Sequence, residues 1–191
     1  MTKRLLPLLT AAALVAIAAP AQASTVPAAD FGAGSRLGLG FAGLSYDHAF
    51  GDTLLGAALN SDGLPTGSSR FKLGVRGLHR FLSLNGVKVG AIAGLQYDPG
   101  VPGQRAYLVP DLGLSFAYTF PGEVPVSVKV NVTLTVDQYT SVDPLNPAPR
   151  GNMLQRLTFG PTSMFGGELQ LNEHLALTLG GGTLAGVRLN Y

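Results

Sequence analysis

The chain has 191 residues, no cysteine, and a formal net charge of +2. The absence of cysteine excludes disulfide bonds. Both charges of the first 23 residues, Lys3 and Arg4, are basic, so the other 168 residues hold 11 Lys and Arg (13 minus 2) against 11 Asp and Glu. This balance excludes a strongly basic surface and gives no support for a nucleic-acid partner. Charged residues make up only 13% of the chain, against roughly a quarter or more of an ordinary soluble surface.

The first 23 residues have the layout of a secretory signal peptide. Lys3 and Arg4 precede an apolar stretch over residues 5–19, and Ala21-Gln22-Ala23 forms a small-x-small cleavage site before Ser24. An apolar stretch of about fifteen residues is short for a membrane anchor. We therefore expect residues 1–23 to be removed on export and residues 24–191 to form one domain. No later run approaches the roughly 18 apolar residues of a membrane-spanning helix.

Turn residues divide the remaining sequence into segments that alternate with a period of two. Phe50-Gly51-Asp52, Asn85-Gly86 and Pro121-Gly122 are the clearest turns, because Asn-Gly in particular accepts the positive φ angles of a tight hairpin. The pattern predicts an all-β fold, an antiparallel up-and-down barrel of eight strands. These strands cover residues 35–47, 53–60, 71–81, 87–97, 108–120, 124–137, 153–170 and 174–191.

The segment 124–137 alternates without a fault, with Val or Leu at even positions and polar residues such as Lys129 and Asp137 at most odd ones. A strand turns successive side chains to opposite faces, so one face is aliphatic and the other is polar. About thirteen residues, each rising roughly 3.3 Å and tilted by about 45°, cover about 30 Å, the thickness of the hydrocarbon core of a bilayer. The segment therefore predicts a strand that spans a membrane.

Three features predict that the aliphatic face meets lipid and the polar face lines a lumen. The polar parity is rich in Gly, Ser, Thr, Asn and Gln, which suits a crowded interior. The chain ends in a strand-like segment with an aromatic last residue. Aromatic residues also gather near the predicted strand ends, as in the interfacial girdles of membrane barrels. They are Tyr46, Phe50, Phe71, Phe81, Tyr97, Tyr107, Tyr118, Phe120 and Tyr139.

The last segment, residues 185–191, carries a resemblance. Its alternating apolar residues Val187 and Leu189 and its terminal Tyr191 resemble the C-terminal recognition strand of bacterial outer-membrane proteins. With the signal peptide and eight strands, the chain is similar to the small barrels of the outer-membrane protein A and X type. The resemblance implies a place in the bacterial outer membrane, contact with its lipids, and assembly by the machinery that reads the last strand. Such barrels include adhesins, structural proteins, lipid-modifying enzymes and narrow pores.

The predicted connections depart from that family. Its longer loops follow odd-numbered strands, whereas the longer connections here, residues 61–69, 98–104 and 141–152, follow predicted strands two, four and six. Either the glycine-rich N-terminal region has been divided wrongly, or the loop asymmetry of this chain is unusual.

The polar parity places a set of charged side chains in the lumen. Buried charges must pair or meet water, so this set predicts either a salt-bridged, filled lumen or an anion-preferring passage. An eight-stranded barrel is just wide enough for side chains to fill it, which favours the filled lumen. The candidates are Arg70, Lys72, Arg76, Arg80, Lys88, Asp111, Lys129, Asp137 and Arg188, with Glu168 as a further possibility.

The remaining motifs give no support for catalysis, a metal or a cofactor. Residues 38–43 match G-x-G-x-x-G, but the glycines lie in strand-like sequence rather than before a helix. His48, His79 and His174 lack metal-ligand spacing. Either His48 beside Asp47, or His174 beside Glu173, could serve a rim enzyme with a distant serine.

We therefore expect a non-enzymatic membrane barrel with a structural or surface-interaction role. The alternatives are a narrow, anion-preferring pore for small solutes, a rim enzyme acting on lipid, and a soluble periplasmic barrel that binds a hydrophobic ligand. The sequence does not define an oligomeric state.

Overall fold

A computed structural model describes residues 27–40, 43–62, 70–99, 106–136, 157–180 and 183–191. The predicted signal peptide lies outside these residues. Within them, no helix is long and apolar enough to cross a membrane. The strands are β1 (Gly34–Gly40), β2 (Gly43–Phe50), β3 (Thr53–Asp62), β4 (Arg70–Leu84), β5 (Val87–Asp98), β6 (Tyr107–Phe120), β7 (Val126–Val136), β8 (Leu157–Phe159), β9 (Met164–Gln170), β10 (Leu175–Gly180) and β11 (Thr183–Asn190).

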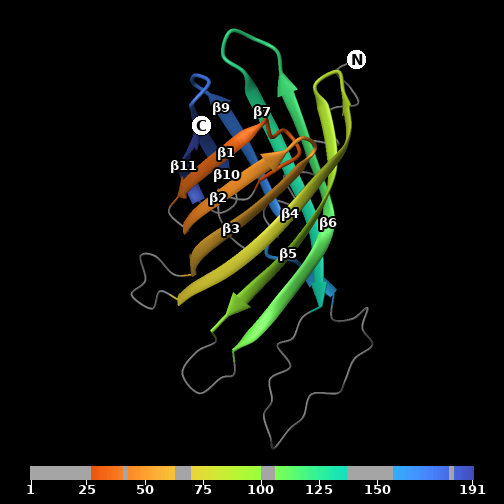
Figure 1. Cartoon of the computed structure of the whole chain (residues 1–191), viewed down its shortest axis with the longest axis vertical. Helices are drawn as coiled ribbons and strands as arrows, with labels where there is room; N and C mark the ends of the chain where they lie inside the picture. The colour runs from red at the N-terminus through yellow and green to blue at the C-terminus, as the bar shows by residue number, and fades with distance from the viewer. Residues whose placement is uncertain (1–26, 41–42, 63–69, 100–105, 137–156, 181–182) are drawn as a thin grey trace, which may run out of the picture.

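The strands form a closed antiparallel barrel (Figure 1). Consecutive strands pair from β1 to β7, β7 pairs with β9, and β9, β10 and β11 lead back to β1. The short strand β8 pairs with the last part of β7, beyond the point where β9 stops. The all-β, antiparallel barrel is confirmed, but the predicted number of eight strands is wrong, because ten strands close the ring.

Two of the predicted strands are hairpins. The predicted strand over residues 35–47 is the pair β1 and β2, and the one over 174–191 is the pair β10 and β11. Each reversal has a connection of only two residues, 41–42 and 181–182, in glycine-rich sequence with apolar residues on both sides. Gly43 follows the first reversal with φ of 153°, and a Cβ atom there would collide with the carbonyl oxygen of Leu59 on β3.

The predicted strand over residues 153–170 is also interrupted. Its described part consists of β8 and β9, separated by a turn at residues 160–163. Thr162 and Ser163 in this turn are buried, so the chain leaves the barrel wall here and enters the interior.

Ten strands also account for the connection lengths. The connections at residues 41–42, 63–69, 99–106, 137–156 and 181–182 all leave from one end of the barrel, which we call the loop end. The opposite end, the turn end, carries the turns at residues 51–52, 85–86, 121–125 and 171–174 together with Tyr191 (Figure 1). When the ten strands of the ring are numbered in order, the longer connections follow odd-numbered strands. The loop asymmetry is therefore not unusual, and the predicted division of the N-terminal region is wrong.

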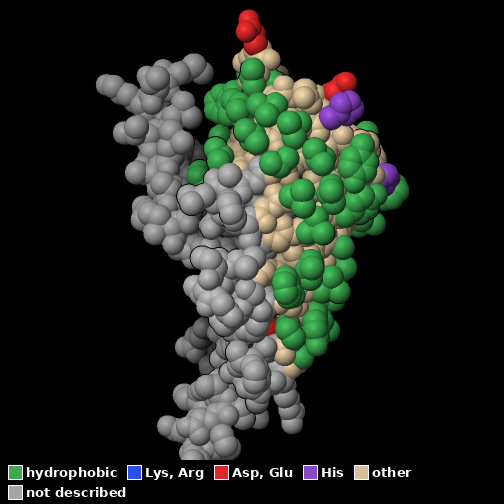
Figure 2. Space-filling view, turned by 90° about the vertical axis from the view of Figure 1, so that its left-hand side faces the viewer, with side chains coloured by type: hydrophobic (Ala, Val, Ile, Leu, Met, Phe, Trp, Pro, Cys, Tyr) green, Lys and Arg blue, Asp and Glu red, His purple; other side chains and the backbone are tan. Residues whose placement is uncertain are grey.

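The polarity of the barrel is inverted relative to a soluble protein. Among the described residues, 18 polar or charged residues are buried against 11 hydrophobic ones, whereas 30 large hydrophobic side chains are exposed. On β7, Val132 and Leu134 are exposed while Lys129, Asn131 and Thr133 are buried. Figure 2 shows apolar side chains over the described surface of one flank, with acidic and histidine side chains gathered near the turn end.

Most of the predicted aromatic residues are exposed, and all of these except Tyr46, in the middle of β2, lie near strand ends. This group comprises Tyr46, Phe50, Phe71, Phe81, Tyr97, Tyr118 and Phe120. Tyr139 and the side chain of Tyr107 lie outside the described part of the chain.

The hairpin assignment makes Gly43 a sensitive position. We expect Gly43→Ala to lower the free energy of unfolding by about 1–3 kcal/mol, because the side chain meets backbone of β3 and the φ angle is unfavourable. Gly122→Ala in an exposed turn is the control, since a Cβ there meets nothing closer than 3.7 Å. Far-ultraviolet circular dichroism of urea unfolding in micelles measures both. Equal effects of the two substitutions would contradict the assignment.

Candidate functional site

The residues before β1 run inside the barrel. We call residues 27–31 the inner segment. Ala28, Ala29 and Phe31 in this segment are 0%, 0% and 1% exposed. The inner segment therefore occupies the lumen as part of the packed interior.

Inward-facing polar side chains hold the backbone of the inner segment. The Ala29 amide donates a hydrogen bond to Oγ of Ser115 on β6 at 2.9 Å. Nδ2 of Asn131 on β7 donates to the Pro27 carbonyl at 2.8 Å. Because buried backbone groups need partners, these two side chains satisfy polar groups that have no strand neighbour.

Phe31 anchors the inner segment near the turn end. Its ring belongs to a buried apolar cluster with Leu54, Leu78 and Ile92. The guanidinium of Arg80 lies 4.7 Å from the ring centroid, within the range of a cation–π interaction, and its Nη1 donates to the Phe31 carbonyl at 2.9 Å. The inner segment is thus fixed by apolar packing as well as by hydrogen bonds.

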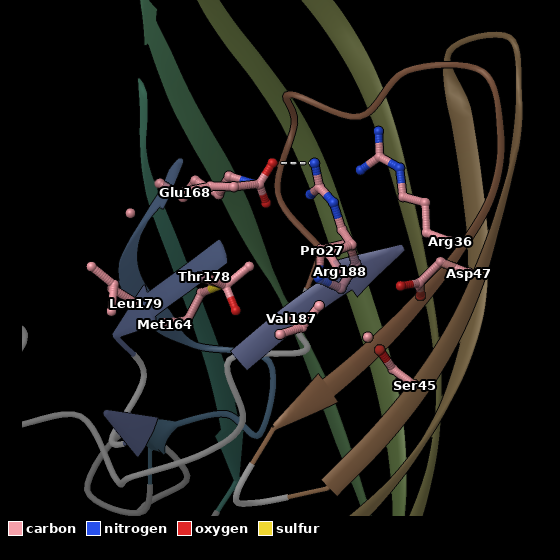
Figure 3. Close-up of a pocket in the computed structure, with 13 residues that line it drawn as sticks. Pro27, Arg36, Ser45, Asp47, Met164, Glu168, Thr178, Leu179, Val187 and Arg188 are labelled. Carbon is pink, nitrogen blue, oxygen red and sulfur yellow. Dashed lines mark hydrogen bonds and ion pairs between the residues drawn. The ribbon is translucent and has the colours of Figure 1, made fainter. Parts of the chain in front are cut away.

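Lys129 lies at the centre of a buried charge cluster. Its Nζ is 3.0 Å from Asp30 of the inner segment and 2.6 Å from Glu168 on β9. Glu168 is also paired with Arg188 on β11 (Figure 3). The Lys129, Asp30 and Glu168 side chains are 5%, 3% and 3% exposed. Charges this deeply buried are stable only when they are paired, which this arrangement provides.

The pKa of Asp30 reflects the same cluster. Burial disfavours the charged carboxylate and would raise its pKa, but attraction by Lys129, Arg188 and Arg36 outweighs burial and lowers the pKa below its ordinary value. Asp30 is therefore ionised in the folded protein at neutral pH.

A second ion pair joins β2 and β4 across the inward face of β3. Arg76 binds Asp47 in a bidentate manner, with Nε and Nη2 each 2.9 Å from a carboxylate oxygen. Gly56 on β3 lies between the two strands, and a Cβ atom there would collide with the Asp47 carboxylate. The glycine thus leaves the space through which Arg76 reaches Asp47.

Nearer the loop end, the turn between β8 and β9 forms a second filled layer. Oδ2 of Asp111 on β6 accepts hydrogen bonds from the Thr162 amide at 2.7 Å, from Thr162 Oγ1 at 2.6 Å and from Thr133 Oγ1 at 2.9 Å. Ser163 Oγ donates to the Thr133 carbonyl at 2.9 Å. Asp111 therefore holds the inward turn against β6 and β7.

The structure places most of the predicted lumen residues inside the barrel. Lys72, Arg76, Asp111 and Lys129 are buried, and the side chain of Arg188 is 14% exposed. Lys72 is 2.9 Å from Asp98, Arg80 pairs with Asp52 at the turn end, and Lys88 is half-buried. Asp137 and the side chain of Arg70 lie outside the described residues.

Sequence reasoning missed four charged residues inside the barrel. Arg36 and Asp47 lie on the segment that was read as one strand, so their inward parity was hidden. Asp98 lies just beyond the predicted end of its strand, although the alternation with Gln96 would have included it. Asp30 precedes the first strand and carries no periodic signal.

The free space beside the charge cluster is small. The cavity lined by Arg36, Asp47, Lys129, Glu168 and Arg188 has a volume of about 20 Å³ (Figure 3). A second cavity, near Asn60 and Asp111, is of the same size. Each volume holds about one water molecule. Neither cavity can hold an organic ligand.

The predicted assembly residues close the ring. Val187 and Leu189 share the outward parity of β11, and Leu189 and Tyr191 are exposed. The backbones of Tyr191 and Ser35 exchange two hydrogen bonds, of 2.8 and 3.0 Å. The last residue of the chain is therefore tied to the beginning of β1.

Within the described part of the chain, neither of the two predicted histidine–carboxylate pairs is joined to a serine as a catalytic site would require. His48 Nδ1 is 2.8 Å from Ser35 Oγ, but Asp47 points into the lumen toward Arg76 and cannot orient this histidine. His174 is paired with Glu173 on an exposed turn. Among the described residues, no three His, Cys, Asp or Glu side chains are grouped as metal ligands.

No protein-family model, curated protein or solved structure matches this chain. The resemblance to small outer-membrane barrels therefore stays a prediction from the sequence.

Lys129 should be the most sensitive position of the lumen. We expect Lys129→Met to lower the free energy of unfolding by about 3–5 kcal/mol, because it leaves Asp30 without its nearest cation and weakens the pairing of Glu168. Asp52→Asn is the matched control. It breaks the pair with Arg80 at the turn end, where the Asp52 side chain is 63% exposed, and should cost under about 1 kcal/mol. Urea unfolding compares them, and similar losses would contradict the role of the cluster.

Asp30 also predicts a dependence on pH. A carboxyl whose pKa is lower in the folded state than in the unfolded state stabilises the fold above its unfolded pKa. This contribution is lost as the pH falls from the unfolded pKa through the folded one. Asp30→Asn should therefore be less stable than the parent at neutral pH, and its stability should fall less on acidification. Unfolding midpoints from neutral to strongly acidic pH measure the difference, and parallel curves would argue against it.

Proposed function

We propose that this chain is an integral protein of the bacterial outer membrane, with a structural or surface-interaction role and a filled lumen. The observation that carries the proposal is the inverted polarity of the barrel. Aliphatic and aromatic side chains cover the outside, while charged and hydroxyl side chains are packed inside. Such a surface is stable in hydrocarbon and would aggregate in water.

The same observation argues against a soluble ligand-binding barrel. A soluble barrel turns its aliphatic face inward, around a cavity for the ligand. Here the inward faces of the strands carry ion pairs, and the two described cavities have a volume of about 20 Å³ each. The predicted signal peptide and the terminal aromatic residue add support for the outer membrane. With the short turns and Tyr191 at one end, we propose that the turn end faces the periplasm.

No observation favours an open pore or a rim enzyme. The inner segment and the turn at residues 160–163 fill the lumen at successive depths. The serine–histidine pair of Ser35 and His48 has no carboxylate partner in Asp47. We therefore expect no steady conductance when the protein is inserted in planar bilayers. A sustained conductance would restore the passage hypothesis.

Membrane insertion can be tested with one outward substitution. Leu114 lies mid-strand on β6 and is 44% exposed. We expect Leu114→Arg to disfavour insertion by about 2–4 kcal/mol, because the charge would lie near the middle of the bilayer. Glu123→Arg, on the exposed turn after β6, is the control and should insert normally. The measurements are outer-membrane fractionation and the heat-dependent shift of the folded barrel on gels. Recovery of the parent as a soluble periplasmic protein would end the proposal.

A further inference from the structure

The barrel wall is much lower on one flank than on the other. We call the strands β10, β11, β1 and β2 the short wall, since they have 6, 8, 7 and 8 residues, whereas β4 and β6 have 15 and 14. With a rise of roughly 3.3 Å per residue and a tilt of about 45°, the short wall is about 14–19 Å high and the opposite wall about 33–35 Å. Figure 1 shows the short wall confined to the turn-end half of the barrel.

The two-residue connections fix the height of the short wall. Two residues suffice only to reverse the chain, so β1–β2 and β10–β11 cannot continue toward the loop end. The flanking strands do continue. β2 begins at Gly43, opposite Asn60, and beyond that point Ser61 and Asp62 of β3 pair with β4 but have no strand neighbour on the β2 side among the described residues. On the other side, β8 is paired only with β7 within the described chain.

The outward face of the short wall is apolar up to its upper limit. Leu39, Leu44 and Leu179, close to the hairpin reversals, are 45%, 42% and 57% exposed. None of the described outward side chains of the short wall is Asp, Glu, Lys or Arg, and most of them are leucines, such as Leu37, Leu175, Leu177 and Leu189.

A bilayer of ordinary thickness does not match this flank. Its hydrocarbon core is about 25–30 Å thick, roughly 10 Å more than the short wall can cover. Unpaired strand edges and hairpin backbone would then lie in hydrocarbon, where polar backbone groups have no partner. Bilayers accommodate a hydrophobic surface that is too short by becoming thinner around it.

We propose that the short wall is a lipid-interaction surface at which the membrane is locally thinned. Lipid acyl chains cover its leucines, and the lipid headgroups on the loop-end side descend to the loop-end limits of β1, β2, β10 and β11. The opposite flank, around β4 to β6, meets bilayer of ordinary thickness. This inference rests on the proposed membrane insertion, and the experiment distinguishes the two.

Single tryptophans can measure depth, because the chain has no tryptophan of its own. We would place them separately at Leu39 and Leu179 on the short wall, and at Leu114 in the middle of β6 as the matched control. Each variant is refolded into phosphatidylcholine vesicles whose acyl chains are brominated either near the headgroup or near the chain end. We expect Leu39→Trp and Leu179→Trp to be quenched more by shallow bromine, and Leu114→Trp more by deep bromine.

Two other outcomes would contradict the thinning of the membrane, and a third would contradict the membrane insertion. If all three tryptophans are quenched mainly by deep bromine, the membrane is not thinned and the inference is wrong. If Leu114→Trp is quenched while the short-wall tryptophans are not, protein rather than lipid covers the short wall, which also overturns it. If no variant is quenched although each shows the heat-dependent shift of a folded barrel, the proposed membrane insertion itself fails.

Discussion

Lys129 connects parts of the chain that lie far apart in sequence. Its ammonium group on β7 is shared by Asp30 of the inner segment and Glu168 of β9, and Glu168 in turn holds Arg188 of β11. Inside a barrel with an apolar exterior, none of these charges can turn outward to water, so each depends on the others. Because Asp30 supplies one of the two carboxylates of Lys129, the inner segment belongs to the fold itself and is not an appendage.

The number of strands determines what must fill the lumen. An eight-stranded barrel is narrow enough for side chains alone to fill, and its interior widens as strands are added. With ten strands, this chain brings backbone into the interior at two depths, as the inner segment and as the turn at residues 160–163. Backbone carries its own polar groups, and Ser115, Asn131 and Asp111 provide the hydrogen bonds that those groups need.

The sequence predicted the barrel well where strands are long and regular. Along β4 to β7 the alternation placed Lys72 and Lys129 on the buried face and Val132 on the exposed face. It failed where two short strands meet across a two-residue reversal, because residues 35–47 read like one continuous strand. Asp30 could not be found at all, since an irregular segment buried by long-range contacts leaves no period in the sequence. The lengths of the predicted connections, which fit ten strands better than eight, were the feature of the sequence that indicated the two extra reversals.

The short wall and the charge cluster are physically linked. β1 and β11 share only five register pairs, against twelve between β5 and β6, so the ladder that closes the ring is short. The ion pairs behind this flank add links to the ladder, because Arg188 ties β11 to β9 and Lys129 ties β7 both to β9 and to Asp30, in the segment that leads into β1. The charged interior therefore supports a ring that is closed by short strands. The low wall and the buried charges behind it are two parts of the same arrangement.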